Sequence, residues 1–579
     1  MNVLARCKSG SIYVQTGYED KDVCKNIAGG HWDAGVRQWT YPCSPQSARN
    51  IFAAFGKRLL VDKQFAELLK KSQEVDELKQ NQDTLEPIPV TKLTPWKHQL
   101  LAYHMVKSQP ATMLALAMGT GKTKVVVDVV QNDPDMRKLL VVCPLSVVRV
   151  WGGEFKKHYA LGNVFVLDED LVMPSNKDDI LVLSLDNGGV KGKLERIKTA
   201  EQTAASGGCR LAVVINYESA WREPVRSYLL KAMFDIVIAD EIHRIKSPGS
   251  KSSKFMEMLG TFNTKRVGLT GTPMPHSPLD IYAQYRFLDK AIFGTSFARF
   301  RQQYAVMGGY CGYQVMAYQN QEEMNRKFYS IAIRVEDDVL DLPPIVEEDR
   351  FCTLSHKAQK TYDSLENDLI ASVGRGEVTA ANGLTLLLRL QQLTGGYLTP
   401  DLDLMHQTLN RVPVAMDDSK MKLLADVLED IDIGQPVVVF CRFVQDLATV
   451  RAVARAQGRA SFELSGRVKE LAAWKQDTTG SVFAVQIQSG GLGIDLTRAH
   501  YCVYYSVGFS LGDYLQSQAR VHRPGQKETV TYIKLIAKHT VDEDVYSAIR
   551  EKRDVVEAVL TQIKGENVRV TQEEETDDN

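Results

Sequence analysis

The 579-residue sequence predicts an α/β protein in which two lobes, each built on a parallel sheet, are joined by helical material and preceded by a small α+β module. Short, continuously apolar runs such as 139–143 and 437–440 are typical of parallel strands that helices bury on both faces. Helical stretches alternate with such runs in two separate regions of the chain. With 44% hydrophobic and 24% charged residues, the chain has the composition of a globular protein with a sizeable core.

The N-terminal residues predict the small module and a helix after it. Residues 1–58 alternate apolar and polar positions, as in Ser11–Val14, which is typical of half-buried strands. Over 59–92, leucines at helical spacing are followed by Pro87 and Pro89, so this segment is expected to be a helical linker that ends in a stiff turn.

The two lobes are expected over 93–290 and 431–560, with helical insertions and the connection between the lobes over 291–430. The segment 187–208 has Gly-Gly pairs near both ends and is rich in Lys, Ala and Thr, and we expect an exposed insertion there. Residues 561–579 end in an acidic run that predicts a tail without packed structure.

Charge and cysteine usage narrow the class of protein. The net charge is -1, so a nucleic-acid site must be a local patch, and no apolar run reaches the roughly 18 residues of a membrane helix. Nine scattered cysteines without a C-x-x-C pair indicate a reducing, cytoplasmic compartment. Cys7, Cys24 and Cys43 with His31 offer zinc ligands, but the spacing lacks the usual paired ligands, and buried free thiols are the preferred interpretation.

The stretch MGTGKT follows a predicted strand and precedes a predicted helix, which is the context of a phosphate-binding loop. The backbone N–H groups of Gly119, Thr120 and Gly121 would surround phosphate oxygens at the helix N-terminus. Lys122 would reach the outer phosphates, and the Thr123 hydroxyl would bind Mg²⁺. The alternative is a glycine-rich turn between a strand and a helix that binds nothing.

Two acidic residues end the apolar run 236–239, at the edge of a parallel sheet where ligand sites open. Asp240 can bind Mg²⁺, and Glu241 can orient and deprotonate an attacking water. A solvated loop is the alternative, but the phosphate loop earlier in the chain makes the catalytic interpretation stronger.

A pair of arginines lies in the segment QSQARVHRPGQ of the second lobe. Arg520 and Arg523 are three residues apart, so on a helical turn both side chains would project from one face toward a single γ-phosphate. An ordinary surface pair of arginines is the alternative.

Seven segments in order, GTGKT, VVCPLSVVRVW, INYE, DEIH, LTGTP, SGGLGIDL and QSQARVHRPGQ, resemble the Snf-type (Swi/Snf-like) ATPases of helicase superfamily two. The resemblance covers about residues 93–550. It implies an enzyme with two RecA-like lobes, ATP and Mg²⁺ in the cleft between them, and double-stranded DNA lying across both. ATP hydrolysis would then move the protein along DNA.

The resemblance also implies roles for single residues. Gln99 would read the adenine, Gln516 would support the catalytic site, and Arg520 and Arg523 would act as arginine fingers. Asp495 stands where many Snf-type proteins have Asn, and in other superfamily-two helicases an acidic residue there binds the ribose. The residues that would lie near the phosphates of the tracked DNA strand are Ser146, Asn216, Ser465 and Ser489.

Other positions of the matching segments are informative as well. Thr270 and Thr272 are similar to residues that relay the state of ATP between the lobes. Leu116 and Ala117 stand where Snf-type proteins commonly carry Asp-Glu, a departure that leaves the phosphate contacts unaffected.

The segments GGHWD and WTYP resemble the small module that precedes the motor in HARP-type annealing helicases. Trp32, Trp39 and Tyr41 would either stack on exposed bases at a DNA junction or form the module's core.

These observations predict an ATP-driven translocase on double-stranded or forked DNA that acts in repair, fork remodelling or strand annealing. A protein recruiter is a further expected partner, and the compact chain favours a bacterial or phage-infected cytoplasm. One alternative is a motor that displaces a DNA-bound protein or serves a restriction or defence complex. Another is an ATP-gated clamp on nucleic acid, although Glu241 and the two arginines favour hydrolysis.

Overall fold

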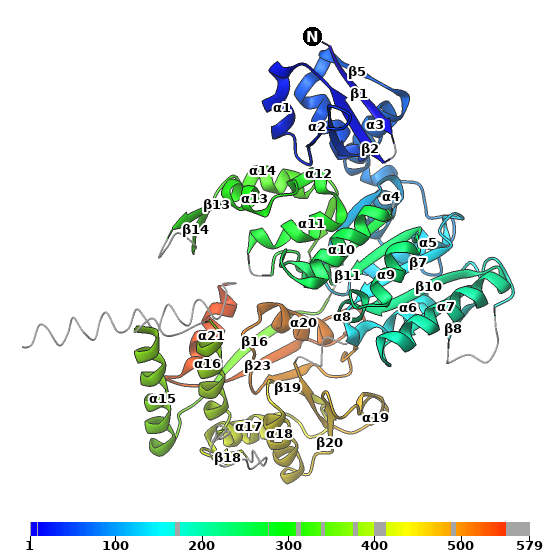
Figure 1. Ribbon diagram of the computed structural model, residues 1–579. Helices are drawn as coiled ribbons and strands as arrows, with labels where there is room; N and C mark the ends of the chain where they lie inside the picture. The colour runs from blue at the N-terminus through cyan, green and yellow to red at the C-terminus, as the bar shows by residue number, and fades with distance from the viewer. Residues whose placement is uncertain are drawn as a thin grey trace, which may run out of the picture. The chain divides into compact units, whose positions relative to one another are not determined.

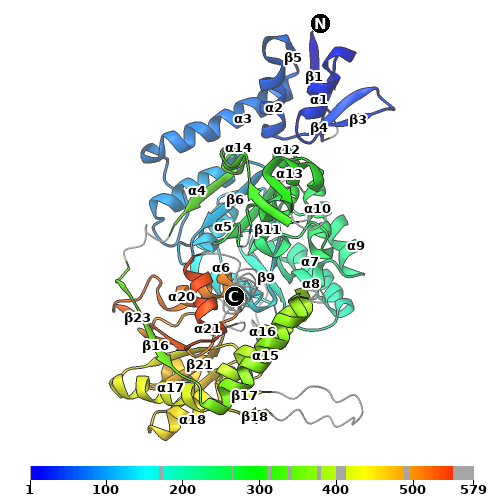
Figure 2. The same ribbon diagram turned by 90° about the vertical axis from the view of Figure 1, so that its left-hand side faces the viewer.

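The structure is a computed structural model, and it divides into two compact units, Met1–Val339 and Leu340–Asn579. Figures 1 and 2 show the elements of each unit. The residues that the structure describes are 2–8, 10–167, 174–263, 265–275, 277–308, 314–336, 342–374, 380–398, 413–487 and 494–551. The expected acidic tail lies outside them. Among these residues, no helix is both long and apolar enough to cross a membrane.

The first unit begins with the small α+β module, which contains a five-stranded sheet in the order β3-β4-β2-β1-β5. Its strands and helices are β1 (Val3–Lys8), β2 (Ser11–Gln15), α1 (Lys21–Asn26), β3 (His31–Asp33), β4 (Gln38–Pro42), α2 (Pro45–Phe55) and β5 (Leu59–Val61). Because β5 pairs in parallel with β1, the module's sheet includes a strand just beyond the expected boundary at residue 58. Local sequence does not reveal this pairing, since its partner lies at the start of the chain.

The expected helical linker is α3 (Lys63–Gln80), which starts at Asp62, whose carboxylate accepts a hydrogen bond from the Phe65 backbone at 2.8 Å. Phe65 is buried in the core of the module, whereas Val75 is buried in a core of the following lobe. The helix is therefore packed against both the N-terminal module and the first lobe.

The first lobe has an eight-stranded sheet in the order β15-β6-β12-β11-β7-β10-β9-β8, and every neighbouring pair is parallel. Its strands are β6 (Ala111–Leu116), β7 (Lys138–Cys143), β8 (Val164–Val166), β9 (Ile180–Leu185), β10 (Arg210–Asn216), β11 (Ile236–Asp240), β12 (Lys265–Thr270) and β15 (Ala332–Val335). Its helices include α4 (Lys97–Ser108), α5 (Lys122–Gln131), α6 (Val150–His158), α7 (Val190–Gly207), α8 (Tyr217–Ala220), α9 (Val225–Lys231) and α10 (Lys251–Phe262).

Both faces of this sheet are buried, which explains the continuous apolar runs. In β7, Leu139 and Val141 face a core that α4, α5 and α6 share, whereas Leu140 and Val142 face a core with residues of α7, α9 and α10. After β12 come α11 (Ile281–Leu288), α12 (Lys290–Phe293), α13 (Phe297–Tyr304), β13 (Ala305–Gly308), β14 (Gln314–Tyr318) and α14 (Gln321–Phe328).

The expected exposed insertion at 187–208 is wrong. This segment forms α7, the connection from β9 to β10, and Ile197, Ala200 and Ala204 are buried in the core of the lobe. These residues are three and four positions apart, so they share one helix face. The segment was predicted to be exposed because it is rich in Lys, Ala and Thr. Its buried face is narrow and consists mostly of small side chains, so it contributes little to the composition.

The second unit contains a six-stranded parallel sheet in the order β16-β23-β22-β19-β21-β20. Its strands are β16 (Ile345–Cys352), β19 (Val437–Cys441), β20 (Ser461–Leu464), β21 (Val482–Gln486), β22 (Tyr501–Tyr504) and β23 (Val530–Ala537). Its helices are α15 (His356–Gly374), α16 (Ala380–Thr394), α17 (Ser419–Asp430), α18 (Val444–Ala456), α19 (Leu471–Gln476), α20 (Leu511–Val521) and α21 (Val541–Arg550), with a short pair of strands, β17 (Tyr397–Leu398) and β18 (Val414–Ala415).

Two lobes of parallel strands covered by helices, preceded by a small mixed sheet, confirm the predicted fold class. The segment 291–430, expected to be helical insertions and a connection, also supplies a strand to each lobe. Its β15 pairs with β6, and its β16 pairs with β23.

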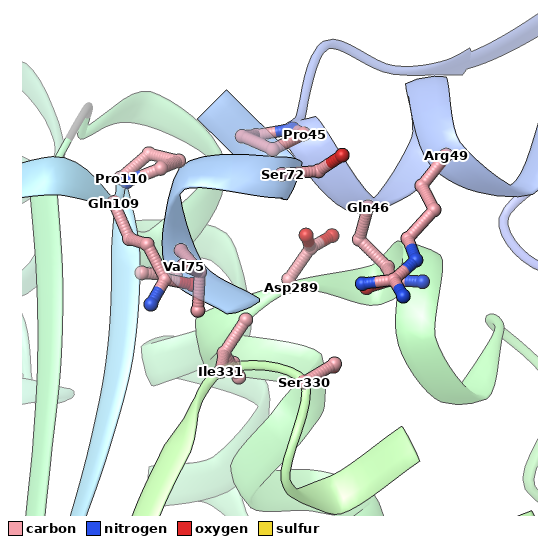
Figure 3. A pocket seen from close by; sticks show the side chains of 11 residues that line it. Pro45, Gln46, Arg49, Ser72, Val75, Gln109, Pro110, Asp289, Ser330 and Ile331 are labelled. Carbon is pink, nitrogen blue, oxygen red and sulfur yellow. The ribbon is translucent and has the colours of Figure 1, made fainter. Parts of the chain in front are cut away.

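The module contacts the first lobe through α2. The Asn50 side-chain amide donates to the Ala291 carbonyl at 3.1 Å, and the Asp289 carboxylate beside it is buried. Figure 3 shows a small pocket at this contact, lined from α2 by Pro45, Gln46 and Arg49 and from the lobe by residues that include Asp289.

Candidate nucleotide-binding and catalytic site

The first lobe brings its predicted site residues to one edge of the sheet. The phosphate loop follows β6, and Asp240 is the last residue of β11. Only β12 separates these two strands, and all three are parallel, so their carboxyl ends open on the same side. Residues from distant parts of the sequence therefore meet there.

The phosphate loop has the backbone that its glycines permit. Gly119 and Gly121 adopt left-handed conformations with φ of 80° and 86°. A side chain at Gly121 would also meet the Gln99 side-chain nitrogen at 2.3 Å. That nitrogen donates to the Thr120 carbonyl at 2.9 Å, and Gln99 is 3% exposed. In this structure Gln99 braces the loop, while its expected contact with adenine stays a prediction.

The loop and the helix after it fit a phosphate group. Helix α5 begins at Lys122 and its N-cap, Gly121, has no side chain to satisfy the first N–H groups, so these groups are suited to an anion. The Lys122 ammonium donates to the carbonyls of Leu116 and Ala117 at 2.8 and 3.2 Å, beside the loop. Thr123 is half-buried in the first turn of α5, whereas the Thr120 hydroxyl donates to Ala117 and is used inside the loop.

Asp240 and Glu241 fit a divalent cation and a base. Burial and the negative charge of Glu241 raise the pKa of the Asp240 carboxyl, whereas the Trp151 hydrogen bond and Lys122 oppose this shift. Glu241 has a left-handed φ of 49°, and among the described residues its Oε2 atom is buried without a hydrogen-bond partner. A buried acidic pair of this kind suits Mg²⁺, whose hard positive charge prefers carboxylate oxygens.

The segment LTGTP is linked to the acidic pair by His243. The His243 Nδ1 atom lies 3.4 Å from Glu241 Oε2 and 3.1 Å from the hydroxyl of Thr270, which is fully buried. The Thr270 hydroxyl also accepts a hydrogen bond from the Thr272 backbone at 3.0 Å. This network connects Thr270 and Thr272 to Glu241 through His243.

Sequence reasoning missed two residues of this site. The Trp151 indole N–H donates to Asp240 Oδ2 at 3.0 Å, and the Tyr217 hydroxyl donates to the Asp240 backbone carbonyl at 2.9 Å. Both residues stand in segments that the sequence singled out, VVCPLSVVRVW and INYE, but their pairing with Asp240 depends on the order of the strands.

In the second lobe the arginine motif departs from its predicted geometry. Gln516 and Arg520 lie on α20, but this helix ends at Val521, so Arg523 stands beyond it and does not share a helix face with Arg520. Pro524 of HRPG disfavours a helical conformation at Arg523, the residue before it, which agrees with the end of the helix at Val521. Arg523 instead donates to the Ile494 carbonyl at 3.1 Å.

A second hydrogen bond joins the same two predicted segments. The Leu496 backbone donates to the Arg520 carbonyl at 2.9 Å, so the end of SGGLGIDL lies beside QSQARVHRPGQ. Within SGGLGIDL, Asp495 accepts hydrogen bonds from the backbone and hydroxyl of Thr497, and Lys475 lies 3.4 Å away. The Asp495 side chain is 48% exposed and thus accessible to a ligand.

The predicted DNA contacts have different surroundings. Ser146 is half-buried in the loop after β7. Asn216 is 5% exposed and holds Lys193 and Glu218, and Ser465 is 3% exposed and caps a turn at Arg467 and Val468. Ser489 lies outside the described residues. The side chains of Asn216 and Ser465 thus have structural partners here.

The module's aromatic residues divide into core and surface. Trp39 and Tyr41 are 8% and 2% exposed and belong to the core, whereas Trp32 is 46% exposed on β3. The rings of Trp32 and Trp39 meet edge to face at 5.7 Å. Cys7, Cys24 and Cys43 are free, and among the described residues no group of three His, Cys, Asp or Glu side chains could hold a metal ion.

A phosphate loop and an acidic pair at one edge of a parallel sheet, followed by a second parallel-sheet lobe with an arginine motif, define a two-lobed P-loop protein of the helicase type. Comparison with protein families agrees with this class. The SNF2-related domain matches residues 36–395, more than half of the chain, and the helicase conserved C-terminal domain matches residues 419–525. The chain belongs to the SNF2-related family.

Several curated proteins are similar to this chain. An uncharacterized ATP-dependent helicase of Mycoplasma genitalium is 24% identical over 469 residues, which is 78% of this chain and 40% of that protein. The DNA repair and recombination protein RDH54 of Saccharomyces cerevisiae is 23% identical over 436 residues, or 71% of this chain and 43% of that protein. The chain thus spans less than half the length of these relatives.

Among solved structures, the Sulfolobus solfataricus SWI2/SNF2 ATPase core in complex with dsDNA is similar to this chain. The identity is 20%, the match covers 83% of this chain and 95% of that one, and the TM-score is 0.37.

Proposed function

We propose that this protein is a DNA-dependent ATPase that translocates on double-stranded DNA, with Mg²⁺ and ATP as cofactors. We further propose that its N-terminal module directs it to forked or partly single-stranded DNA in repair, fork remodelling or strand annealing. The observation that carries the ATPase proposal is the meeting of the phosphate loop, Asp240 and Glu241 at one sheet edge in a member of the SNF2-related family.

Each residue of the first lobe has a role in this proposal. Lys122 and the N–H groups at the start of α5 bind the outer phosphates, while Thr123 and Asp240 hold Mg²⁺, which neutralises charge that develops on the phosphate oxygens. Glu241 orients the attacking water and accepts its proton, because its buried Oε2 atom accepts no hydrogen bond among the described residues and has His243 Nδ1 as a neighbour at 3.4 Å.

Residues of the second lobe complete the proposed reaction. Arg520 and Arg523 donate to the γ-phosphate as charge develops on it, and Gln516 on the same segment supports them. Asp495 binds the ribose with its exposed carboxylate, and Gln99 of the first lobe recognises adenine. Because the arginines and the phosphate loop stand on different lobes, hydrolysis requires the lobes to close.

The DNA proposal has its own support. One relative is named for DNA repair and recombination, and the exposed Trp32 offers an aromatic face on which a base can stack. On the first lobe, Ser146 lies near Leu145 and Arg149, whose side chains are solvent-exposed in the same loop. An exposed arginine of this kind binds DNA phosphates without reading sequence.

The test is steady-state ATP hydrolysis without nucleic acid and with single-stranded DNA, duplex DNA, forked DNA or RNA. The Lys122→Ala variant is the blank, since it removes the phosphate-binding ammonium. We expect the strongest stimulation by duplex or forked DNA. Stimulation by RNA alone would contradict the DNA proposal, and DNA binding without any stimulated turnover would favour the ATP-gated clamp.

A second assay tests translocation itself. A labelled third strand bound to a duplex reports translocation along naked DNA. We expect ATP-dependent displacement of that strand by the wild-type chain and none by Lys122→Ala. A wild-type chain that hydrolyses ATP on DNA but never displaces the strand would contradict translocation.

A further inference from the structure

Asp240 is held from two sides by aromatic side chains of the first lobe. Trp151 is 1% exposed, and its indole N–H reaches the Oδ2 atom at 3.0 Å. Tyr217 is 2% exposed, and its hydroxyl reaches the backbone carbonyl of the same residue at 2.9 Å. With the Glu241 backbone N–H donating to Oδ1 at 3.0 Å, both the rotation of the carboxylate and the position of its backbone are fixed.

These two aromatic residues stand in segments that follow neighbouring strands. Tyr217 directly follows β10 as the first residue of α8, and Trp151 lies on α6, which follows the loop after β7. In the sheet, β7 lies between β11 and β10, so the segments after β7 and β10 lie beside Asp240. Each segment therefore supplies one buried hydrogen-bond donor to the same residue.

The loop after β7 also reaches solvent. Its residue Leu145 is 51% exposed, and the side chain of Arg149, two residues before Trp151, is 67% exposed. The Arg149 guanidinium pairs with Asp186, which follows β9. A ligand that contacts this loop is therefore bound next to the start of α6. The Trp151 side chain of α6 in turn donates a hydrogen bond to Asp240.

We propose that Trp151 and Tyr217 are positioning residues that set the geometry of Asp240 for Mg²⁺, and that Trp151 transmits nucleic-acid binding at the loop after β7 to this carboxylate. This inference rests on the proposed function, which assigns Mg²⁺ to Asp240 and DNA to this loop. Neither side chain contacts the reacting groups. Their effect passes through Asp240, and so it is an effect on metal-dependent nucleotide binding and on stimulation by DNA.

The experiment uses the full chain with Trp151→Phe and Tyr217→Phe, each of which removes one donor and keeps a ring. Tyr159→Phe is the matched control, because it removes another hydroxyl that donates to a backbone carbonyl, that of Asp178 at 2.7 Å, close to the end of α6. Binding of a fluorescent, non-hydrolysable ATP analogue is titrated with Mg²⁺, with and without duplex DNA. Thermal melting is measured for every variant.

For Trp151→Phe and Tyr217→Phe we expect the Mg²⁺ concentration at half-saturation to rise about tenfold, the usual effect of losing one hydrogen bond to a charged or buried group. We also expect DNA to lower this concentration for the wild-type chain and for Tyr159→Phe, and to have little effect on Trp151→Phe. Stimulation of ATP hydrolysis by DNA should fall in parallel.

Folded variants with the Mg²⁺ dependence and DNA response of the wild-type chain would overturn the inference. If Trp151→Phe fails to fold, Tyr217→Phe decides the question, since it removes only a hydroxyl. If no nucleic acid stimulates ATP hydrolysis by the wild-type chain, the proposed function is overturned instead. The Mg²⁺ titration without DNA would still decide whether the two side chains position Asp240.

Discussion

Glu241 has an unusual backbone for its residue type. Its left-handed φ of 49° is unfavourable for a residue with a side chain, by about 1–2 kcal/mol. Its N–H donates to Asp240 Oδ1 at 3.0 Å. The side chain then lies 3.4 Å from His243 Nδ1. Unfavourable backbone geometry at an acidic residue beside a phosphate loop is consistent with the catalytic role we propose for it.

The first prediction concerns this side chain. Glu241→Gln keeps the shape of the residue but cannot accept a proton, so we expect DNA-stimulated turnover to fall about 100-fold or more while ATP binding persists. Turnover is measured by phosphate release and binding with a fluorescent ATP analogue. Glu195→Gln, which changes an exposed acidic residue of α7 in the first lobe, is the control. Equal turnover in Glu241→Gln and the wild-type chain would remove the proposed base.

Asp446, a buried acidic residue, makes the stability of the second lobe depend on pH. Asp446 Oδ2 accepts hydrogen bonds from the Phe443 backbone at 3.2 Å and from the Ser506 hydroxyl. Burial raises the pKa of Asp446 to about 6, the Ser506 hydrogen bond and Lys420 oppose the rise, and Asp542 adds to it. Because the folded pKa exceeds the ordinary value near 3.8, the contribution of Asp446 is complete below about pH 4 and is lost as the pH rises through 6.

The second prediction follows from this sign. Between pH 4 and 7 the wild-type chain should lose about 3 kcal/mol of stability from this group, at about 1.4 kcal/mol for each unit of pKa, whereas Asp446→Asn should not. Melting temperatures are measured at pH 4.5 and 7, with the exposed Asp363→Asn as control. Relative to the wild-type chain, the melting temperature of Asp446→Asn should be higher at pH 7 than at pH 4.5. Parallel changes in the two proteins would contradict the prediction.

At the scale of elements, α7 shows how a polar composition conceals a packed helix. The helix runs over Val190–Gly207, and Gly208, which follows it, has a left-handed φ of 62° that ends the helix. Its buried residues Ile197, Ala200 and Ala204 face the sheet, while its lysines lie mostly on the exposed side. Burial of one stripe is sufficient to hold the helix against β9 and β10.

The third prediction tests this packing. Ala200 is fully buried, so Ala200→Asp places a charge in the core and should destabilise the first lobe by about 3 kcal/mol or more. The neighbouring Thr199 is exposed, and Thr199→Asp should change stability by no more than about 0.5 kcal/mol. Thermal unfolding followed by circular dichroism compares the two variants. Equal melting temperatures would mean that α7 is not packed as described.

The fourth prediction concerns the strand pair β3 and β4 of the N-terminal module. Since Trp32 is 46% exposed, Trp32→Ala should leave the melting temperature almost unchanged and weaken binding to forked DNA about tenfold, the value of one stacked base. Trp39→Ala, at a position 8% exposed, should lower the melting temperature instead. Fluorescence anisotropy with forked and plain duplex DNA measures the preference. Unchanged preference in Trp32→Ala would exclude this side chain as a junction contact.

At the scale of the whole molecule, the proposed chemistry is divided between two compact units. The phosphate loop and the acidic pair belong to Met1–Val339, whereas Arg520 and Arg523 belong to Leu340–Asn579. The first unit would then bind the nucleotide by itself, whereas hydrolysis would need both units, so a substitution could abolish one activity and keep the other. Under the proposed function, this division would allow a cycle of hydrolysis to drive movement of one lobe relative to the other.

The fifth prediction separates these properties. Arg523→Ala should abolish DNA-stimulated hydrolysis, with a loss of about 1000-fold, and should leave binding of a fluorescent ATP analogue nearly unchanged. Arg455→Ala, which changes an exposed arginine of α18, is the control. Arg523 donates to the Ile494 carbonyl, so melting temperatures are compared as well. A variant that only binds ATP more weakly would show that Arg523 is not an arginine finger.

Local sequence predicted much of this protein because local physics determines those features. Continuous apolar runs predict β7 and β11, since only strands buried on both faces need them. The glycines of the phosphate loop and the acidic pair after β11 were also visible, because each depends on a few consecutive residues. These features predicted the fold class and the candidate nucleotide site.

Tertiary structure alone decided which distant residues meet. No pattern within a few residues of Trp151 or Tyr217 reveals that both donate to Asp240, and none near Leu59 reveals that β5 pairs with β1. The burial of α7 was likewise settled by packing. The physical reason is that periodicity records whether a side chain is buried, whereas its partner is chosen by the order of the strands in the sheet.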